Sequence, residues 1–222
     1  NLVYDFLKAR DYTFVSLSSS WTGTYKNTKS DITLANDLKQ NGFEIILLKK
    51  TPLALFLPNM QVKILPMHTN SILDNISKIN NIQGPTFSYV HILSPHPPFV
   101  FEPDGSIVSG LGYCMEGKDG SHYFESCPGV NKYQERYVNQ LAYLNMRFET
   151  IINEILENSE TPPIIILQSD HGPGSMLDWT SLENSNVQER LSILNAYYAP
   201  EKTKEMLYPS ITPVNSFRVL FN

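Results

Sequence analysis

The chain has 222 residues, of which 41% are hydrophobic and 18% are charged, and its formal net charge is −5. This composition provides enough apolar material for one sizeable core and excludes a disordered protein. The 17 Lys and Arg residues form no basic stripe, so no nucleic-acid partner is expected. The most apolar stretch, 42–57, contains Lys49, Lys50 and Pro52 and falls short of the roughly 20 residues that cross a membrane. Neither a membrane span nor a signal peptide is therefore predicted within these residues.

Helical and extended patterns alternate along the first half of the chain. Apolar residues at helical spacing predict a helix over 2–7, and β-branched and aromatic residues predict a strand over 12–17. A buried helix is predicted over 43–57, with an interruption near Thr51, because a residue before proline avoids the α region. Two further elements follow, namely a short amphipathic helix over 72–79, capped by Asn70 or Ser71, and a strand over 87–93.

The second half continues the alternation of helices and strands. A turn is predicted at 103–105, and a 3.6-residue apolar period predicts a long helix over 138–155. The apolar run 164–167 has the pattern of a central parallel strand buried on both faces, and 191–198 predicts another strand. A last helix is expected to start at Thr212-Pro213. These elements predict one α/β domain with a mostly parallel central sheet and helices on both faces.

The segment Ser169-Asp170-His171-Gly172 directly follows the apolar run 164–167. Open α/β sheets bind their ligands at the carboxyl ends of such strands. Gly172 and Gly174 permit the backbone turn that would bring the carboxylate and the imidazole to one ion. The alternative is that Asp170 caps a turn and His171 is an ordinary loop histidine. We favour a divalent metal site, since an ionised Asp with a neutral His suits Zn or Mn, with Mg or Ca as further options.

Two histidines lie in or just after the predicted strand 87–93. His91 lies within the strand 87–93, and His96 follows it in a loop that contains three prolines. Imidazole titrates near neutral pH, so His96 is predicted to contact a substrate oxygen, to protonate a leaving group or to bind a second metal. His91 is predicted either to bind substrate or to be a hydrogen-bonded core residue.

Three further features bear on function. Arg190 is predicted to bind an anionic ester, because a guanidinium clamps such groups well. Cys114 and Cys127 flank a loop-like segment and either form a disulfide, as in an oxidising compartment, or remain free thiols. The polar run 18–21 after the first strand lacks the tight turn of a nucleophile elbow and shows no nearby base in the sequence, so it is interpreted as a strand-end loop.

These motifs resemble the sulfatase-like domain of the alkaline phosphatase superfamily, as found in lipoteichoic-acid synthases and phosphoethanolamine transferases. Ser169-Asp170-His171-Gly172 matches the metal motif of that family, and His96 with the strand before it is similar to the loop that faces the substrate. The segment 189–198 resembles its C-terminal strand. The resemblance implies an alkaline-phosphatase-like α/β fold and a metal-dependent hydrolase or transferase that acts on sulfate or phosphate esters through a covalent intermediate.

The same resemblance implies what else to expect. In the family, an acidic residue and a Thr, Ser or modified Cys nucleophile complete the site, and neither matches a segment of this chain. We therefore expect 1–222 to be the C-terminal part of one domain, incomplete at its N-terminus, with the nucleophile outside the chain and little activity in the isolated fragment. Neither cysteine fits the sulfatase signature Cys-x-Pro-x-Arg. The alternative is a degenerate, non-catalytic module that binds an anionic polymer or lipid.

Partners and location also follow from the resemblance alone. It implies an anionic ester substrate that is lipid- or glycan-linked. It also implies a protein on the extracytoplasmic face of a membrane, attached through residues that precede this chain.

Overall fold

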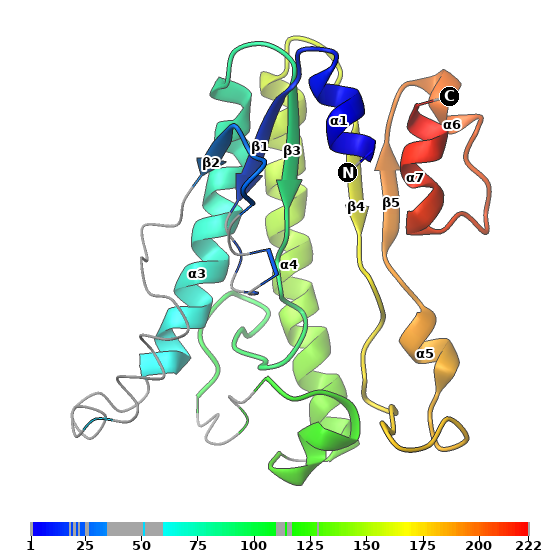
Figure 1. Ribbon diagram of the computed structural model, residues 1–222. Helices are drawn as coiled ribbons and strands as arrows, with labels where there is room; N and C mark the ends of the chain where they lie inside the picture. The colour runs from blue at the N-terminus through cyan, green and yellow to red at the C-terminus, as the bar shows by residue number, and fades with distance from the viewer. Residues whose placement is uncertain are drawn as a thin grey trace.

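The computed structural model describes residues 2–17, 19, 21, 23–24, 27–34, 51, 60–109, 114, 117–127 and 129–221 (Figure 1). The predicted helix over 43–57 lies outside these residues, apart from Thr51. Within the described part of the chain, no helix has both the length and the apolar character that crossing a membrane requires.

Helices and strands alternate along the described chain, as the sequence predicts. In chain order they are α1 (Leu2–Lys8), β1 (Thr13–Leu17), β2 (Ile32–Leu34), α3 (Met60–Ile76), the 3₁₀ helix η2 (Ser77–Asn81), β3 (Thr86–Val90), the 3₁₀ helix η4 (Gly120–Glu125), α4 (Val130–Asn158), β4 (Ile165–Gln168), α5 (Val187–Leu191), β5 (Asn195–Tyr198), α6 (Glu201–Lys204) and α7 (Pro213–Leu220).

A parallel sheet occupies the middle of the described structure, with the strand order β2-β1-β3. In its register, Leu17 of β1 is the partner of both Leu34 and Val90. Because the three strands run in the same direction, the segments that follow them leave the sheet at one edge. This edge is where α/β proteins gather functional groups.

The second sheet pairs β4 with β5 in antiparallel orientation, from Ile165 opposite Tyr198 to Gln168 opposite Asn195. All four residues of β4 are half-buried. The prediction of a central parallel strand buried on both faces is therefore wrong for β4. A short apolar run alone does not indicate strand direction, since direction depends on how the chain returns, and here it returns through α5. β4 nevertheless runs in the same direction as β3 (Figure 1).

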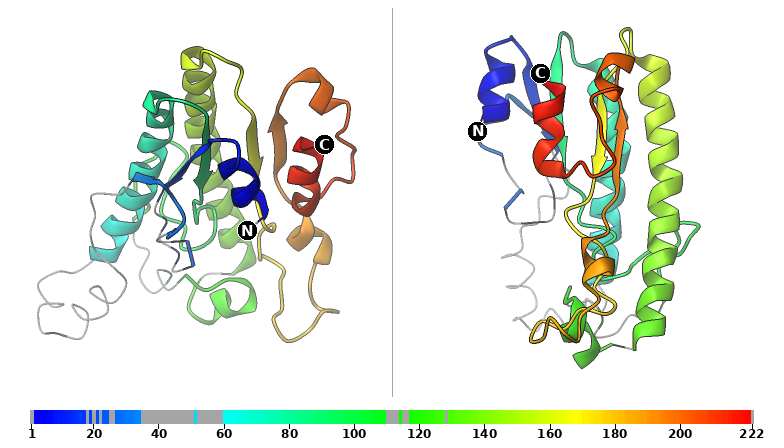
Figure 2. Two further views of the ribbon diagram at one scale, coloured as in Figure 1. Left: turned by 45° about the horizontal axis from the view of Figure 1, so that its top comes forward. Right: turned by 90° about the vertical axis from the view of Figure 1, so that its right-hand side faces the viewer.

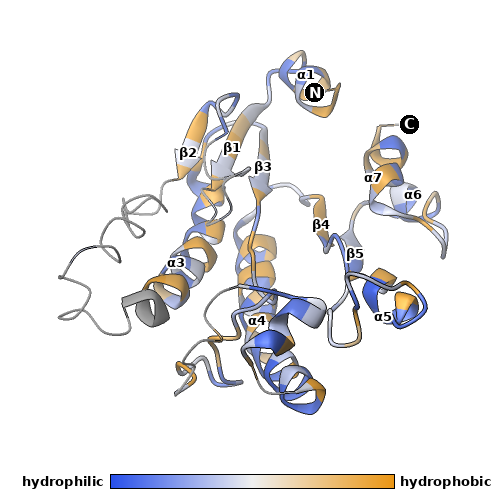
Figure 3. Ribbon diagram, turned by 60° about the horizontal axis from the view of Figure 1, so that its bottom comes forward, coloured by the Kyte–Doolittle hydropathy of each residue, from blue (hydrophilic) through white to orange (hydrophobic). Residues whose placement is uncertain are grey.

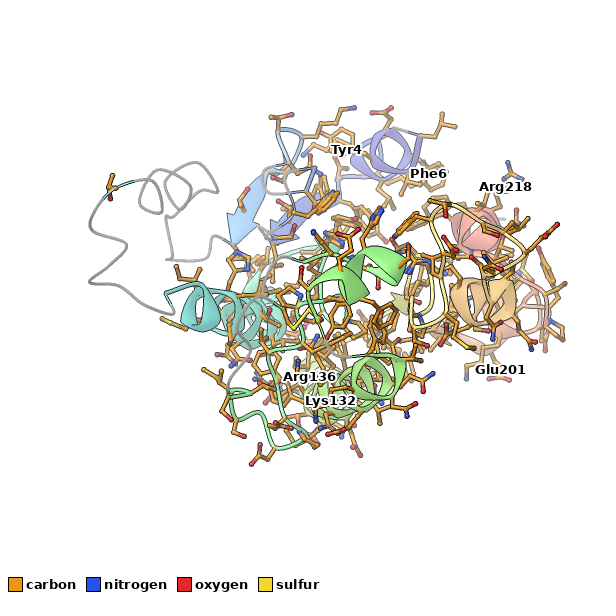
Figure 4. The ribbon with its side chains drawn as sticks, turned by 90° about the horizontal axis from the view of Figure 1, so that it is seen from below. Tyr4, Phe6, Lys132, Arg136, Glu201 and Arg218 are labelled. Carbon is orange, nitrogen blue, oxygen red and sulfur yellow. A yellow bond between two sulfur atoms is a disulfide. The ribbon has the colours of Figure 1, made fainter. Side chains whose placement is uncertain are left out.

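Helices cover both faces of the strands, with α3 and α4 on one face and α1 and α7 on the other (Figure 2). Figure 4 shows Tyr4 and Phe6 on α1 and Arg218 on α7 at one side of the molecule, and Lys132 and Arg136 on α4 at the opposite side. The face under α1 and α7 is aromatic, because Tyr4 packs on Phe14 and Phe87 packs on Phe217. The predicted α/β class, with helices on both faces, is confirmed.

The main core lies between the parallel sheet and the helices α3 and α4. Leu17, Leu73 and Leu144 are all at most 2% exposed, and burial of each such side chain contributes about 1.5–3 kcal/mol. Hydrophobic and hydrophilic residues alternate along both helices (Figure 3), as amphipathic helices that cover a sheet require. The core therefore fixes the sheet against α4. The first turns of this helix lie near the edge at which the parallel strands end (Figure 1).

Helix boundaries differ from the predictions at several places. α3 begins at Met60, so Asn70 and Ser71 lie inside the helix and do not cap it. α4 begins at Val130, well before the predicted start at 138. Its first turns pack against a second, aromatic cluster formed by Phe99, Tyr123 and Tyr133, and not against the main core. α7 starts where predicted, with Thr212 as N-cap and Pro213 in the first turn, but the Thr212 hydroxyl makes no capping hydrogen bond.

Candidate active site

The candidate active site lies where β1, β3 and β4 end. The segments that follow these strands gather at the lower end of the molecule in Figure 1, together with η4, α5 and the first turns of α4. The parallel pairing of β1 with β3 explains why residues distant in sequence meet here.

Asp170 and His171 follow β4 and face each other at this edge. The backbone N–H of His171 donates to Asp170 Oδ1 over 3.0 Å, and the ring Nδ1 of His171 is 2.9 Å from the Gly172 carbonyl oxygen. Since a carbonyl oxygen can only accept, Nδ1 carries the proton of the neutral ring and Nε2 keeps its lone pair. That Nε2 lies 3.6 Å from Asp170 Oδ2.

This geometry fits two ligands of one divalent ion. Ligand atoms that are each about 2.1 Å from a metal lie about 3–4 Å apart, and the second ring nitrogen of a ligating His is usually tied to a carbonyl or carboxylate. The Asp170 side chain is 88% exposed, so its oxygens are open to an ion. Among the residues that the structure describes, no group of three or more His, Cys, Asp or Glu side chains is arranged to hold a metal.

His96 lies next to this pair. Its Nδ1 is 2.7 Å from the Pro97 carbonyl oxygen, which leaves Nε2 as the nitrogen that faces outward in the neutral ring. The ring centroids of His96 and His171 are 6.5 Å apart. The structure therefore brings three of the predicted site residues, Asp170, His171 and His96, to one place, as expected from the strand-end rule.

His91 is hydrogen-bonded to hydroxyl groups that follow β1. Its Nδ1 is 2.6 Å from Thr24 Oγ1 and 3.3 Å from Ser19 Oγ, and the two hydroxyls are 2.6 Å apart. Burial lowers the pKa of His91, and the charge of Asp170 opposes that shift, so the ring is mainly neutral at pH 7 and able to accept a proton. The sequence shows no base near the segment 18–21, yet the fold supplies one from the neighbouring strand.

Arg190 lies in α5 with its guanidinium turned toward the protein. Its Nη1 donates to Asp119 Oδ2 over 2.8 Å and to the Gly172 carbonyl oxygen over 3.1 Å. The predicted role of Arg190 in substrate binding stays a prediction. Arg190 and the His171 ring share one acceptor, because both donate to the Gly172 carbonyl oxygen.

Asp119 is the buried acceptor of this network, with its side chain only 5% exposed. Burial raises the pKa of the Asp119 carboxyl, but hydrogen bonds from Tyr133 and the Gly120 N–H, the charge of His96 and the hydrogen bond from Arg190 lower it, and the net pKa is below the usual value. The carboxylate is therefore ionised inside the protein. Tyr133 Oη donates to Asp119 Oδ1 over 2.6 Å.

The segment that carries Asp119 is closed by a disulfide between Cys114 and Cys127. The same segment reaches the loop after β4, where Trp179 Nε1 donates to the Asp119 carbonyl oxygen over 2.9 Å and Ser121 N–H donates to Leu177 O over 2.7 Å. The disulfide thus closes a loop that directly contacts the segment after β4, here called the metal-motif loop (169–179).

Sequence reasoning missed Thr24, Asp119 and Tyr133. Thr24 had a signal, because it follows one predicted strand and His91 lies toward the end of another, and neighbouring parallel strands bring such residues together. Asp119 and Tyr133 had none, since their meeting depends on how the disulfide-closed loop packs on α4.

A comparison with protein families matches residues 3–211 of the chain to the family described as Sulfatase. No curated protein matches the chain. No solved structure matches it either.

Proposed function

This chain belongs to the sulfatase family, and from that premise we propose that the protein is a metal-dependent hydrolase or transferase that cleaves a sulfate or phosphate ester through a covalent intermediate. The family membership supports the general activity, an enzyme that acts on ester bonds. The residues at the strand ends support the finer proposal.

One observation carries the mechanism: the Thr24 hydroxyl lies 2.6 Å from Nδ1 of His91, and this imidazole is near enough to Asp170 for the charge of that carboxylate to raise its pKa. A hydroxyl paired with a neutral imidazole is the arrangement that activates a Ser or Thr nucleophile. We assign Thr24 as the nucleophile and His91 as its base, in place of the nucleophile that the family resemblance located outside the chain.

Asp170 and His171 would hold the divalent ion, for which Zn or Mn fits an Asp and His pair and Mg or Ca are further candidates. When bound, such an ion withdraws electron density from the ester and stabilises charge on the transferring group. Sulfatase-family proteins generally use a divalent metal, which supports this assignment.

The steps at the protein residues follow from these positions. Thr24 Oγ1 attacks the phosphorus or sulfur atom while His91 Nδ1 takes its proton, and the ester bond to the leaving oxygen breaks. His96, in its protonated form, donates the Nε2 proton to that oxygen, because its Nδ1 is already held by Pro97. Water or a second hydroxyl then attacks the threonine ester and gives its proton to His96 Nε2, while the bond from the transferred group to Thr24 Oγ1 breaks and His91 returns its proton to Thr24.

The substrate class and location are proposals of the same kind. We propose an anionic ester that is lipid- or glycan-linked, and an extracytoplasmic location. The Cys114–Cys127 disulfide supports that location, since such bonds persist in oxidising compartments.

The test uses the full-length protein with p-nitrophenyl sulfate, p-nitrophenyl phosphate and bis-p-nitrophenyl phosphate as probes. Asp170→Asn is expected to abolish metal-dependent cleavage and to lower metal content, whereas Glu135→Gln, an exposed carboxylate paired with Lys132, should change neither. Activity and metal content that survive Asp170→Asn would refute the metal assignment.

The nucleophile is tested by a matched pair at one position. Thr24→Val keeps the shape but removes the hydroxyl and should abolish turnover, while Thr24→Ser keeps a hydroxyl and should retain part of it. Mass spectrometry of quenched reactions should find the phosphoryl or sulfuryl group on Thr24. Full turnover in Thr24→Val would exclude Thr24 as nucleophile.

A variant of His96 distinguishes a role in proton transfer from a role as a metal ligand. His96→Ala should lower turnover more than metal occupancy, and the reverse result would make His96 a ligand. A wild-type protein that binds metal and an anionic polymer but cleaves none of the probes would be the non-catalytic module instead.

A further inference from the structure

Asp119 contacts the metal-motif loop through two short chains of hydrogen bonds. In the first, the Asp119 carboxylate accepts from Arg190, Arg190 also donates to the Gly172 carbonyl, and that carbonyl accepts from the His171 ring. The partner that fixes the His171 tautomer is therefore itself held by the Asp119–Arg190 pair. Such outer partners orient ligating histidines and keep the ligand nitrogen pointing at the ion.

The second chain runs through Tyr133 of α4. Its hydroxyl donates to Asp119 Oδ1 over 2.6 Å and accepts from the Gly174 N–H over 2.9 Å. The Tyr133 side chain is buried and packs edge-on against Phe99 and Tyr123. The Tyr133 hydroxyl thus links the Asp119 carboxylate to the backbone of the loop after β4. Tyr133 itself belongs to α4, which packs on the core.

The loop also lies in close contact with the carboxylate itself. A Cβ atom added at Gly174 would lie 2.6 Å from Asp119 Oδ1 and 2.7 Å from Oδ2, and no room exists for it. At Gly172 an added Cβ would collide with the backbone carbonyl oxygen of Glu189 in α5. The loop between these glycines therefore packs directly on Asp119 and α5, with little freedom to take another path.

We propose that Asp119 is a positioning residue: acting through Arg190 and Tyr133, its buried carboxylate sets the conformation of the 172–174 segment and so the orientation of His171 toward a divalent cation. The proposal rests on the proposed metal site at Asp170 and His171. It also assigns Arg190 to this framework and not to direct contact with the substrate. A buried charge pair that removes two ions from water is costly, and its use here is to fix one arrangement of the loop.

The same helix offers matched controls. Tyr143 of α4 is also buried, and its hydroxyl donates to Asn70 Oδ1 over 2.6 Å and accepts from Arg147 over 2.9 Å. Arg147 in turn pairs with Asp74 on α3. Tyr143→Phe and Arg147→Ala therefore remove the same chemical groups as Tyr133→Phe and Arg190→Ala, but at the contact between α3 and α4.

The experiment measures Zn²⁺ affinity of the full-length protein by competition with a chromophoric chelator. Asp119→Asn, Tyr133→Phe and Arg190→Ala are expected to weaken Zn²⁺ binding by about 10–100-fold, the usual effect of losing an outer partner. Tyr143→Phe and Arg147→Ala should leave Zn²⁺ affinity at the wild-type value. Thermal unfolding of each variant shows that the comparison is made on folded protein, and Tyr133→Phe is the variant least prone to unfold, because the ring remains.

A second readout does not depend on metal or on activity. In the metal-free protein, ¹⁵N spectra of the His171 ring, assigned by their loss in His171→Asn, should show a proton on Nδ1 in the wild type and in the two control variants. Arg190→Ala and Tyr133→Phe should shift the ring toward a mixture of the two tautomers.

The outcomes are distinct. Wild-type Zn²⁺ affinity and an unchanged His171 tautomer in Tyr133→Phe and Arg190→Ala would overturn the positioning role. If the wild-type protein binds no Zn²⁺, the proposed metal site fails, and the ring spectra alone decide whether Asp119 positions His171. Equal losses of affinity in the controls would show a general effect of stability and would also overturn the proposal.

Discussion

The start and the middle of α4 use the same residue types for different purposes. In the first turns of α4, Tyr133 binds the carboxylate of Asp119 together with Arg190 of α5, and near the middle of the helix Tyr143 and Arg147 bind Asn70 and Asp74. The Asp119 side chain is 5% exposed, whereas that of Asp74 is 61% exposed. The ion pair between Arg147 and the exposed Asp74 joins two helices that the core already holds together. The buried network instead binds the backbone of the loop after β4, at the Gly172 carbonyl and the Gly174 N–H.

This difference separates stability from positioning. An exposed ion pair is screened by water and contributes little, so its loss is tolerated. A buried pair contributes little net energy when intact, yet its loss leaves one charge uncompensated inside the protein. Burial of Asp119 is therefore better explained by the fixed geometry it gives to Gly172–Gly174 than by any gain in folding energy.

The largest expected effect comes from breaking the buried pair. Asp119→Ala leaves Arg190 without its carboxylate and is expected to cost about 3–5 kcal/mol of unfolding free energy. Asp74→Ala, at the exposed pair, is expected to cost about 0–1 kcal/mol. Urea unfolding of both variants measures the difference, and similar losses of unfolding free energy at Asp119 and Asp74 would remove the distinction between the two networks.

A smaller effect is expected from the disulfide that closes the segment carrying Asp119. Replacing both Cys114 and Cys127 with Ser should cost about 3 kcal/mol, the value for a loop of roughly 15 residues in the chain-entropy model. Compared with the disulfide-bonded protein, amide hydrogen exchange should then be accelerated more in 117–127 than in α3. Protection that is lost equally in both regions would indicate a global effect and not one confined to the site end.

The smallest expected effect concerns pH and two histidines, His68 on α3 and His91 after β3. Burial lowers the pKa of His68 and of His91 below the usual value for histidine. A His with a lowered folded-state pKa binds its proton more tightly in the unfolded chain, so the stability is fully present above the usual pKa of His and is lost as the pH falls through the lowered folded-state pKa.

The midpoint of thermal unfolding, followed between about pH 5 and 7.5, around the usual pKa of His, should therefore rise with pH. In His68→Gln this rise should be reduced, because one of the two groups no longer titrates. A rise of the wild-type size in that variant would assign the pH dependence to other groups.

Much of the fold and part of the site could be predicted from the sequence. The amphipathic period that defines α4 and the proline at the start of α7 are local signals, and the structure bears them out. The placement of Asp170, His171 and His96 at strand ends also followed from the chain order of apolar runs and polar residues. Such features depend on neighbours within a few residues, which the sequence displays directly.

Other features depended on the tertiary structure. Whether β4 ran parallel or antiparallel to its partner, whether His91 met Thr24, and whether Arg190 faced Asp119 were decided by segments far apart in the chain. A side chain's partner across the fold depends on how strands pair and how a closed loop packs on a helix, and neither is encoded by local spacing. The sequence by itself thus determined which chemical groups stand at the sheet edge, while only the folded chain decided which of them touch.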